Sequence, residues 1–271
     1  MRNKFIRIQV ASNVAVIWLN RPAALNAVDD AMVRELDAAL VLIETDSSVR
    51  AVVLAGEGRA FCAGTDLSTM ERLGNAGLTK TSQVAQRFAG LLYRLYRLKK
   101  PTIARVHGAS DGAGIGLIAA CDIAVASLEA TFCMSETRLG LAAASVAPYL
   151  LQAIGARQAS RYMLSAETFT AAEAYRIGLI QELAPFEELD STVNGLLGNL
   201  LLGGPKAQVA SKEIIGQVSR CPITPDLVAN LSLRTAELQI SSEGREGSAA
   251  FLGKRQPAWA ARKKKTGRTR K

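Results

Sequence analysis

The hydrophobic positions of the chain change their period along its length, and each period predicts a different element. Near the N-terminus, apolar and polar residues alternate in two short runs, FIRIQVAS and VAVIWLN, which meet at Ser12 and Asn13. A period of two predicts strands, and a two-residue connection predicts a hairpin. Over residues 29–44 the apolar residues recur at helical spacing instead, at Val33, Leu36, Leu40 and Ile43. This second pattern predicts an amphipathic helix.

Strand and helix patterns then alternate up to about residue 145. AVVLAGEG, PTIARVHG and DIAVAS are typical of buried strands, and residues 83–98 form a second amphipathic pattern. The segment RLGNAGLTKT is polar and rich in glycine, which favours a flexible connection. GAGIGLIAACD predicts a glycine turn that opens an apolar helix. The first half is therefore expected to be α/β with crossover connections.

After Ser145 the patterns become helical. Two such segments, PYLLQAIG and ARQASRYMLS, adjoin one another, and four more follow up to residue 239. LIQELA is the one segment of this part that predicts a strand. No linker is long enough to separate two independent domains, so a helical part is expected to pack on or beside the first.

Charge and composition narrow the function classes. The 271 residues carry a net charge of +9, but the last ten, RKKKTGRTRK, hold seven Lys or Arg. A basic tail of this kind is usually solvated, and no RNA-binding aromatic motif or helix-turn-helix signature supports a nucleic-acid partner. The chain has no apolar run long enough for a membrane span and no signal-peptide pattern, so we expect a cytoplasmic protein. Its four cysteines do not have the spacing of a zinc site. The chain has a single histidine, His107, which is too few for a histidine-rich metal site.

The segment VHGASDGAGIGLIAACDI places Gly112, Gly114 and Gly116 at every second position. The dinucleotide-binding fingerprint needs a different glycine spacing and a later acid, and the Walker pattern is absent. Small-residue packing against a neighbouring helix is one alternative. The other uses a second small-residue turn, RAFCAGTDL, read as strand, turn and helix. Two such turns facing each other would offer two backbone N–H groups to one oxygen, as in an oxyanion hole.

Five segments in the same order, over about residues 5–259, resemble the crotonase (enoyl-CoA hydratase/isomerase) superfamily. They are LNRPAALNAV, AFCAGTDLSTM, VHGASDGAGIGLIAACDIAVAS, TFCMSETRLGL and GREGSAAFLGKRQPAW. The resemblance implies an α/β fold, a crotonase-like spiral of ββα units with a helical C-terminal trimerisation part. It implies an acyl-CoA thioester substrate with no separate cofactor, since coenzyme A is part of the substrate. It also implies a homotrimer or a hexamer formed by two trimers.

The resemblance also assigns parts of the chain and site residues. The spiral core would span residues 1–195, the helical part 196–259 and the basic tail 260–271. The oxyanion hole would be formed by the N–H groups of Thr65 and Ala113. The remaining assignments are coenzyme A contacts, at Ala23, Leu25, Ala63, Asp66, Leu67, Phe251 and Lys254.

The acid–base residues carry the main departure from the family. Hydratases of this family use two glutamates; Glu136 matches the later one, whereas Gly116 stands at the earlier position. One glutamate with an oxyanion hole suits a Δ3–Δ2 enoyl-CoA isomerase, or a hydratase that holds its water in another way. Residues 135–180 resemble the bacterial methylglutaconyl-CoA hydratase-like subgroup, which favours a lyase acting on a short or branched 2-enoyl-CoA. A non-catalytic acyl-CoA-binding or nucleic-acid-binding member is the alternative from another class. For Asp111, which precedes the turn, a turn or capping role is expected, and a side chain that faces the pocket is the alternative.

Overall fold

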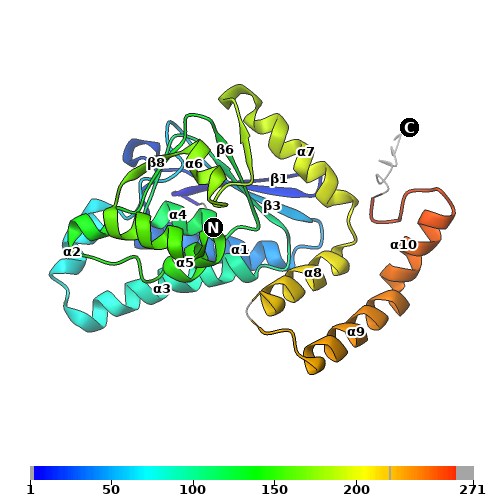
Figure 1. Ribbon diagram of the computed structural model, residues 1–271. Helices are drawn as coiled ribbons and strands as arrows, with labels where there is room; N and C mark the ends of the chain where they lie inside the picture. Colours follow the sequence, from blue (N-terminus) through cyan, green and yellow to red (C-terminus); the bar gives the residue numbers. More distant parts are fainter. Residues whose placement is uncertain (1–2, 220, 261–271) are drawn as a thin grey trace, which may run out of the picture. The chain divides into compact units, whose positions relative to one another are not determined.

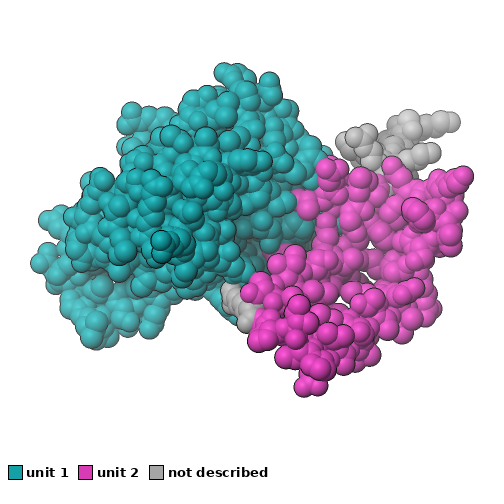
Figure 2. Space-filling view, in the orientation of Figure 1, with its two compact units in different colours: residues 1–197 teal, residues 198–271 magenta. Residues whose placement is uncertain are grey.

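The computed structural model describes residues 3–219 and 221–260, and it divides into two compact units, residues 1–197 and 198–271. Figure 2 colours the two units separately. The division falls within helix α7, Leu189–Leu202, and the boundary expected after residue 195 falls in the same helix.

A six-stranded sheet forms the centre of the first unit, in the order β1-β2-β3-β4-β6-β9. Its strands are β1 Ile6–Ala11, β2 Val14–Leu19, β3 Ala51–Gly56, β4 Thr102–Val106, β6 Ile123–Ser127 and β9 Glu182–Ala184. β1 and β2 are antiparallel, and Ser12 and Asn13 between them both have positive φ, so the expected hairpin is confirmed. The other neighbours are parallel, as crossover connections require.

A second sheet of three short strands lies beside the functional segments. Its order is β5-β7-β8, with β5 Ala109–Asp111, β7 Thr131–Cys133 and β8 Thr168–Thr170. β5 and β7 are parallel and β7 and β8 antiparallel. The expectation of a single strand after residue 145 is therefore wrong, because β8 also lies there. Three residues are too few to show a period of two, and the pairing with β7 stabilises the strand.

The helices of the first unit cover the larger sheet. They are α1 Asp30–Thr45, α2 Leu67–Gly74, α3 Gly77–Arg97, α4 Ala113–Ala119, α5 Ala147–Ser165, α6 Ala171–Arg176 and the first part of α7. Figure 1 shows α1 and α3 running side by side below the strands. The Asp29 side chain accepts a hydrogen bond from Met32 N and begins α1 where the sequence predicts it. Three single-turn segments, Pro22–Ala24, Ser135–Leu139 and Phe186–Glu188, are 3-10 helices.

Of two predicted connections, one differs from the structure and the other agrees with it. The polar segment expected to be flexible is instead divided between the end of α2 and the start of α3, because Asp66 caps α2 by accepting a hydrogen bond from Thr69 N. The two adjoining helices expected after residue 147 are confirmed as two parts of α5, which change direction at Gly155 with φ +73° and ψ 159°.

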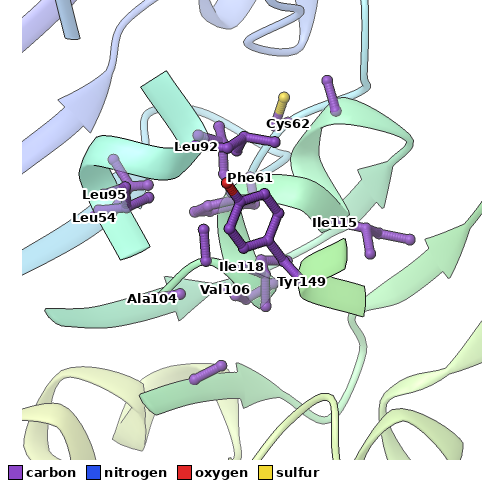
Figure 3. Close-up of a cluster of buried hydrophobic side chains, with 14 of the residues drawn as sticks. Leu54, Phe61, Cys62, Leu92, Leu95, Ala104, Val106, Ile115, Ile118 and Tyr149 are labelled. Atoms are coloured by element: carbon purple, nitrogen blue, oxygen red, sulfur yellow. The ribbon is translucent and has the colours of Figure 1, made fainter. Parts of the chain in front are cut away.

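The hydrophobic core connects α3, α4 and the sheet directly under the candidate site. Figure 3 shows Phe61, Leu92, Ile115 and Tyr149 in this cluster, together with Leu54 of β3. All five side chains are less than a tenth exposed. Their burial fixes the start of α4 relative to the loop that follows β3.

The second unit, described by itself, consists of helices. They are the end of α7, α8 Pro205–Val218, α9 Pro225–Ile240 and α10 Ser242–Leu252. Ala210 and Ala250 are the buried residues of α8–α10 among those that the structure describes. Trp259 Nε1 donates a hydrogen bond to Leu202 O at 2.9 Å, which ties the end of the described chain to α7. Of the basic tail predicted at 260–271, residues 261–271 lie outside the described residues.

Candidate active site

The glycine turn ends β5 and begins α4. Gly112 has φ +43° and ψ −104°, a conformation that side-chain-bearing residues rarely adopt. Its N–H donates to Cys133 O of β7 at 2.9 Å, which fixes the turn to the small sheet. Ala113 is the first residue of α4, so its N–H has no partner within the helix.

The second small-residue turn lies directly against the first. Cys62 N donates to Ala109 O at 3.2 Å, and Asp111 N donates to Cys62 O at 2.9 Å. A methyl group on Gly114 would lie 2.5 Å from Cys62 O, so the absence of a side chain there allows α4 to approach. The expected meeting of the two turns is thus present. No regular strand precedes the second turn; Cys62 and Thr65 form isolated bridges instead, and α2 follows.

Thr65 and Ala113 each present a free backbone N–H. Thr65 bridges Val28, but the hydrogen bonds of that bridge use the neighbouring groups, from Val28 N to Gly64 O and from Asp66 N to Val28 O. Over residues 3–219 and 221–260, neither Thr65 N nor Ala113 N donates to a protein acceptor. These are the two donors that the sequence analysis assigned to an oxyanion hole.

Glu136 reaches the glycine turn from the 3-10 helix at Ser135–Leu139. A methyl group on Gly112 would lie 2.8 Å from Glu136 Oε1, so the carboxylate rests against the turn. Its Oε2 atom is buried and has no hydrogen-bond partner in the described part of the chain. Burial is the main reason that the pKa of Glu136 is raised, and the negative charge of Asp111 adds to the rise. A carboxylate with a raised pKa is a stronger base than an ordinary glutamate.

Position 116 faces the hydrophobic core. A methyl group on Gly116 would lie 2.7 Å from Val146 Cγ2 and 3.4 Å from Leu92 Cδ1. The space that a glutamate side chain would need at this position is therefore filled by apolar groups. The second glutamate is missing from the sequence, and its place is also missing from the structure.

Asp111 does not act as the expected cap. The N-terminus of α4 has no side-chain cap, and Asp111 makes no side-chain hydrogen bond or ion pair within the described chain. It is half-buried at the end of β5, and burial raises the pKa of its carboxyl group. Of the two roles expected for Asp111, turn or cap, the cap is not formed, because Gly112 and not Asp111 occupies the N-cap position of α4.

Comparisons with known proteins place this geometry in a family. A family model described as "Enoyl-CoA hydratase/isomerase" matches residues 9–262. The chain belongs to the enoyl-CoA hydratase/isomerase family. A Rhodobacter capsulatus protein named "Probable enoyl-CoA hydratase" is 36% identical, over 95% of this chain and 98% of its own. The short-chain-enoyl-CoA hydratase of Clostridium acetobutylicum is 31% identical, over 92% and 94%.

The solved structures bear out the fold. The crystal structure of an enoyl-CoA hydratase from Shewanella pealeana superposes with a TM-score of 0.93 at 32% identity, covering 95% of this chain and 97% of that one. The crotonase fold, with ββα units and C-terminal helices, is confirmed. The protein is an enzyme of the enoyl-CoA hydratase/isomerase family, so the non-catalytic alternative falls away, and its family implies an acyl-CoA substrate.

The structure brings together most of the residues that the sequence analysis assigned to coenzyme A. Ala63 N donates to Leu25 O at 2.9 Å, and Asp66 and Leu67 follow Ala63 closely at the start of α2. Leu67 is 81% exposed, and Ala23 is exposed on the 3-10 helix that precedes Leu25. Of these residues beside the enzyme's second turn, Ala23 and Leu67 are exposed, Leu25 and Ala63 are partly exposed, and Asp66 is buried.

Three of the residues assigned to coenzyme A have surroundings that differ from the expectation or lie in the second unit. The Asp66 carboxylate is occupied by protein donors, from Ser68 Oγ, Thr69 N and Arg21 Nη2. The hydrogen bond from Ser68 is the main cause that lowers the pKa of Asp66. Phe251, which is 85% exposed, and Lys254 belong to the second unit, near the end of α10.

Two residues that position this surface were missed from the sequence. Arg21 Nη1 donates to Ala27 O at 2.6 Å, and Nη2 donates to Asp66 at 3.0 Å. The fully buried Asn26 side chain donates to Glu57 O and Ala60 O, each at 2.8 Å. Together they tie the loop before α1 to the loop after β3. In the sequence, Arg21 and Asn26 are visible only as polar residues inside the LNRPAALNAV segment, and that pattern does not show what their side chains contact.

A cavity of about 420 Å³ lies on the other side of β4 from the core, and His107 and Arg105 line it with Phe186. His107 Nε2 lies 2.8 Å from Gly58 O, and burial lowers the pKa of its imidazole. Arg105 pairs with Asp190 at 2.5 Å. His107 is thus engaged by the protein, as a structural histidine would be. Among the described residues, no cluster of His, Cys, Asp or Glu could hold a metal ion, and no helix is long and apolar enough to cross a membrane.

Proposed function

We propose that the enzyme is a lyase that adds water to a short or branched 2-enoyl-CoA, with Glu136 as its acid–base residue. The observation that carries this proposal is the Glu136 carboxylate, which has a buried, unpartnered oxygen and rests against the turn that presents Ala113 N–H. A partnerless carboxylate is costly to bury, and binding a water molecule or a proton would offset that cost.

In the proposed reaction, the thioester oxygen lies between Thr65 N–H and Ala113 N–H. Glu136 removes a proton from water as the water oxygen attacks C3. The electrons of the double bond move toward the thioester, and the two N–H groups stabilise the negative charge that develops on its oxygen. Protonation of C2 then completes the addition, and the proton that Glu136 took from water balances the proton that C2 receives. An N–H donor of this kind typically contributes about 3–4 kcal/mol to the transition state. The small residues of both turns leave room for the thioester to approach the backbone.

The acyl group belongs to the proposal as well. We infer a short or branched and carboxylated substrate of the methylglutaconyl-CoA kind, which would place the enzyme in branched-chain amino acid or fatty acid breakdown in the cytoplasm. The resemblance of residues 135–180 to that subgroup supports this, and the short-chain specificity named for the Clostridium acetobutylicum relative supports a small acyl group. Coenzyme A would lie against Ala23, Leu25, Ala63, Asp66 and Leu67, and Phe251 and Lys254 would add contacts, Lys254 as a charge for a phosphate.

Self-association is proposed for the helical part, as a homotrimer or a pair of trimers. The helices α8–α10 leave large apolar side chains exposed, including Ile215, Leu233 and Phe251. Copies of the same chain would cover these residues, and burial of that apolar surface would stabilise the assembly.

Gly116 supports a second candidate function, Δ3–Δ2 enoyl-CoA isomerisation. A proton shift between C2 and C4 needs one base and an oxyanion hole, and Glu136 alone could serve. The apolar surroundings of Gly116 leave no carboxylate at the family's second position, which suits this simpler chemistry.

A paired absorbance assay separates the two reactions. Hydration of crotonyl-CoA or methylglutaconyl-CoA removes the conjugated double bond and its absorbance, whereas isomerisation of a 3-enoyl-CoA creates both. We expect loss of absorbance with the 2-enoyl substrates. We also expect Glu136→Gln to reduce turnover about 100-fold or more while butyryl-CoA, which has no double bond to hydrate, still binds. Near-normal hydration by the variant would contradict the assignment of Glu136.

A further inference from the structure

Asp111 is the acidic residue that the chain places beside Glu136. It ends β5, where its register partner is Cys133 of β7, three residues before Glu136. The next residue, Gly112, is the one against which Glu136 Oε1 rests. On the other side, the absent side chain of Gly64 leaves space directed at Asp111, whose carbonyl oxygen and Cβ lie 3.1 Å and 3.8 Å from the position of a methyl group there. Asp111 therefore lies between Glu136 and the turn that carries Thr65.

The surroundings of Asp111 do not explain it as a structural residue. It forms no hydrogen bond or ion pair through its side chain in the described part of the chain, although it is half-buried. Asp66 and Asp122, by contrast, both accept hydrogen bonds from protein donors. A half-buried carboxyl group without partners costs stability, so its presence calls for a role in binding or chemistry.

Within residues 3–219 and 221–260, the charge of one other carboxyl group, that of Asp111, acts on Glu136. A side chain at position 116 would meet Val146 and Leu92, as described above. The charge of Asp111 acts on the thiols of Cys62 and Cys133, and Glu136 and Arg138 also act on Cys133. Both thiols are raised in pKa by burial and stay neutral, so Asp111 and Glu136 are the two acidic groups that interact here.

We propose that Asp111 is the second catalytic carboxyl group of this enzyme, and that it shares one proton with Glu136 across the glycine turn. The inference rests on the proposed hydratase reaction. Repulsion between two half-buried carboxyl groups disfavours the state in which both are ionised, and a pair that holds one proton has one group as the acid and the other as the base. The pair titrates as a unit, and its apparent pKa values belong to both residues.

The shared proton completes the addition of water. The ionised carboxylate takes a proton from water, the water oxygen bonds to C3, and the C2–C3 π electrons move to form the thioester enolate. The protonated carboxyl group then gives its proton to C2 as the enolate electrons return to form the C2–H bond. One proton has entered the pair and one has left, so its total charge is unchanged and one water molecule has been added.

The test compares Asp111→Asn with the unchanged enzyme and with Asp226→Asn, a matched substitution at an exposed residue on α9. The substrate is the 2-enoyl-CoA that the unchanged enzyme hydrates fastest. We expect Asp111→Asn to lower kcat about 100-fold or more with little change in butyryl-CoA binding, whereas Asp226→Asn retains full activity.

The pH profile distinguishes a catalytic role from a structural one. The pair predicts a bell-shaped dependence of kcat/KM on pH for the unchanged enzyme, because one proton must be present on two groups. Burial continues to raise the pKa of Glu136 in Asp111→Asn, but the contribution from the charge of Asp111 is gone. The acidic limb of the profile should therefore move to lower pH, and the alkaline limb should disappear. An unshifted bell, or a kcat near that of the unchanged enzyme, would overturn the proposal.

Stability provides a separate readout. The folded-state pKa of Asp111 is raised above 3.8, so the folded protein retains a proton that the unfolded chain loses as pH rises. Stability therefore falls as pH rises from about 3.8 toward the folded pKa, and Asp111→Asn should become increasingly stable relative to the unchanged enzyme over that window. Loss of stability at neutral pH together with loss of activity would assign Asp111 a structural role. Activity retained by Glu136→Gln would refute the proposed function itself, whereas failure of Asp111→Asn alone refutes only this inference.

Discussion

Replacing a glycine within a helix by alanine usually raises the free energy of unfolding, but the packing around Gly116 predicts that this replacement lowers it. A methyl group there would lie 2.7 Å from Val146 Cγ2, about 0.8 Å closer than a favourable carbon–carbon contact of about 3.5 Å. Val146 is 3% exposed and has little room to move. Overpacking of this kind costs about 1–3 kcal/mol, against a helix-propensity gain of about 0.5–1 kcal/mol for alanine over glycine. We expect Gly116→Ala to lower the free energy of unfolding by about 1–2 kcal/mol.

Gly90 is the matched control, because it lies within α3 and a methyl group there meets nothing within 4 Å. Gly90→Ala should raise the free energy of unfolding by about 0.5–1 kcal/mol, opposite in sign to Gly116→Ala. Urea unfolding of both variants, at one fixed protein concentration, measures the two changes as shifts of the midpoint at constant slope.

A double-mutant cycle with Val146→Ala tests the contact itself. Val146→Ala alone removes two buried methyl groups and should cost about 2 kcal/mol, including the cavity that it leaves. The alanine methyl at position 116 would occupy part of that space, so the double variant should recover about 1–2 kcal/mol relative to the sum of the single changes. Strict additivity, or a stabilising Gly116→Ala, would refute the conclusion that this position has no room for a side chain.

Two further predictions concern the oxyanion hole and the assembly. Ala113→Pro removes the N–H proposed to bind the thioester oxygen, and proline is well tolerated at this first helical position. We expect kcat to fall about 100- to 1000-fold in a variant that keeps its circular dichroism spectrum. Full activity would remove this donor from the mechanism. Sedimentation equilibrium should give a mass of three or six chains. Leu233→Glu, on a side chain that is 60% exposed in the single chain, should reduce that mass whereas Gln239→Glu on the same helix should not; a monomer in every case would contradict the trimer.

Elements with a sustained period were predictable because local spacing alone decides which face of a helix or strand is apolar. The hairpin at Ser12 and Asn13 and the helix α1 with its Asp29 cap follow from such patterns. The three-residue strands β5, β7 and β8 carry no readable period. They exist because backbone groups at distant positions of the chain satisfy one another, which no local pattern reveals.

The sequence by itself determined the family and the residues of the two small-residue turns, since the order and identity of short motifs are sequence properties. It also identified Glu136 as a candidate acid–base residue and Gly116 as a departure from the two-glutamate pattern of the family's hydratases. Only the tertiary structure decided what surrounds these residues. Among the described residues, the buried Oε2 atom of Glu136 has no hydrogen-bond partner, and Asp111 does not cap α4. Apolar side chains fill the space beside Gly116. Whether a carboxyl group is a cap, an ion-pair partner or an acid depends on the groups around it, and folding brings those groups from several strands and loops at once.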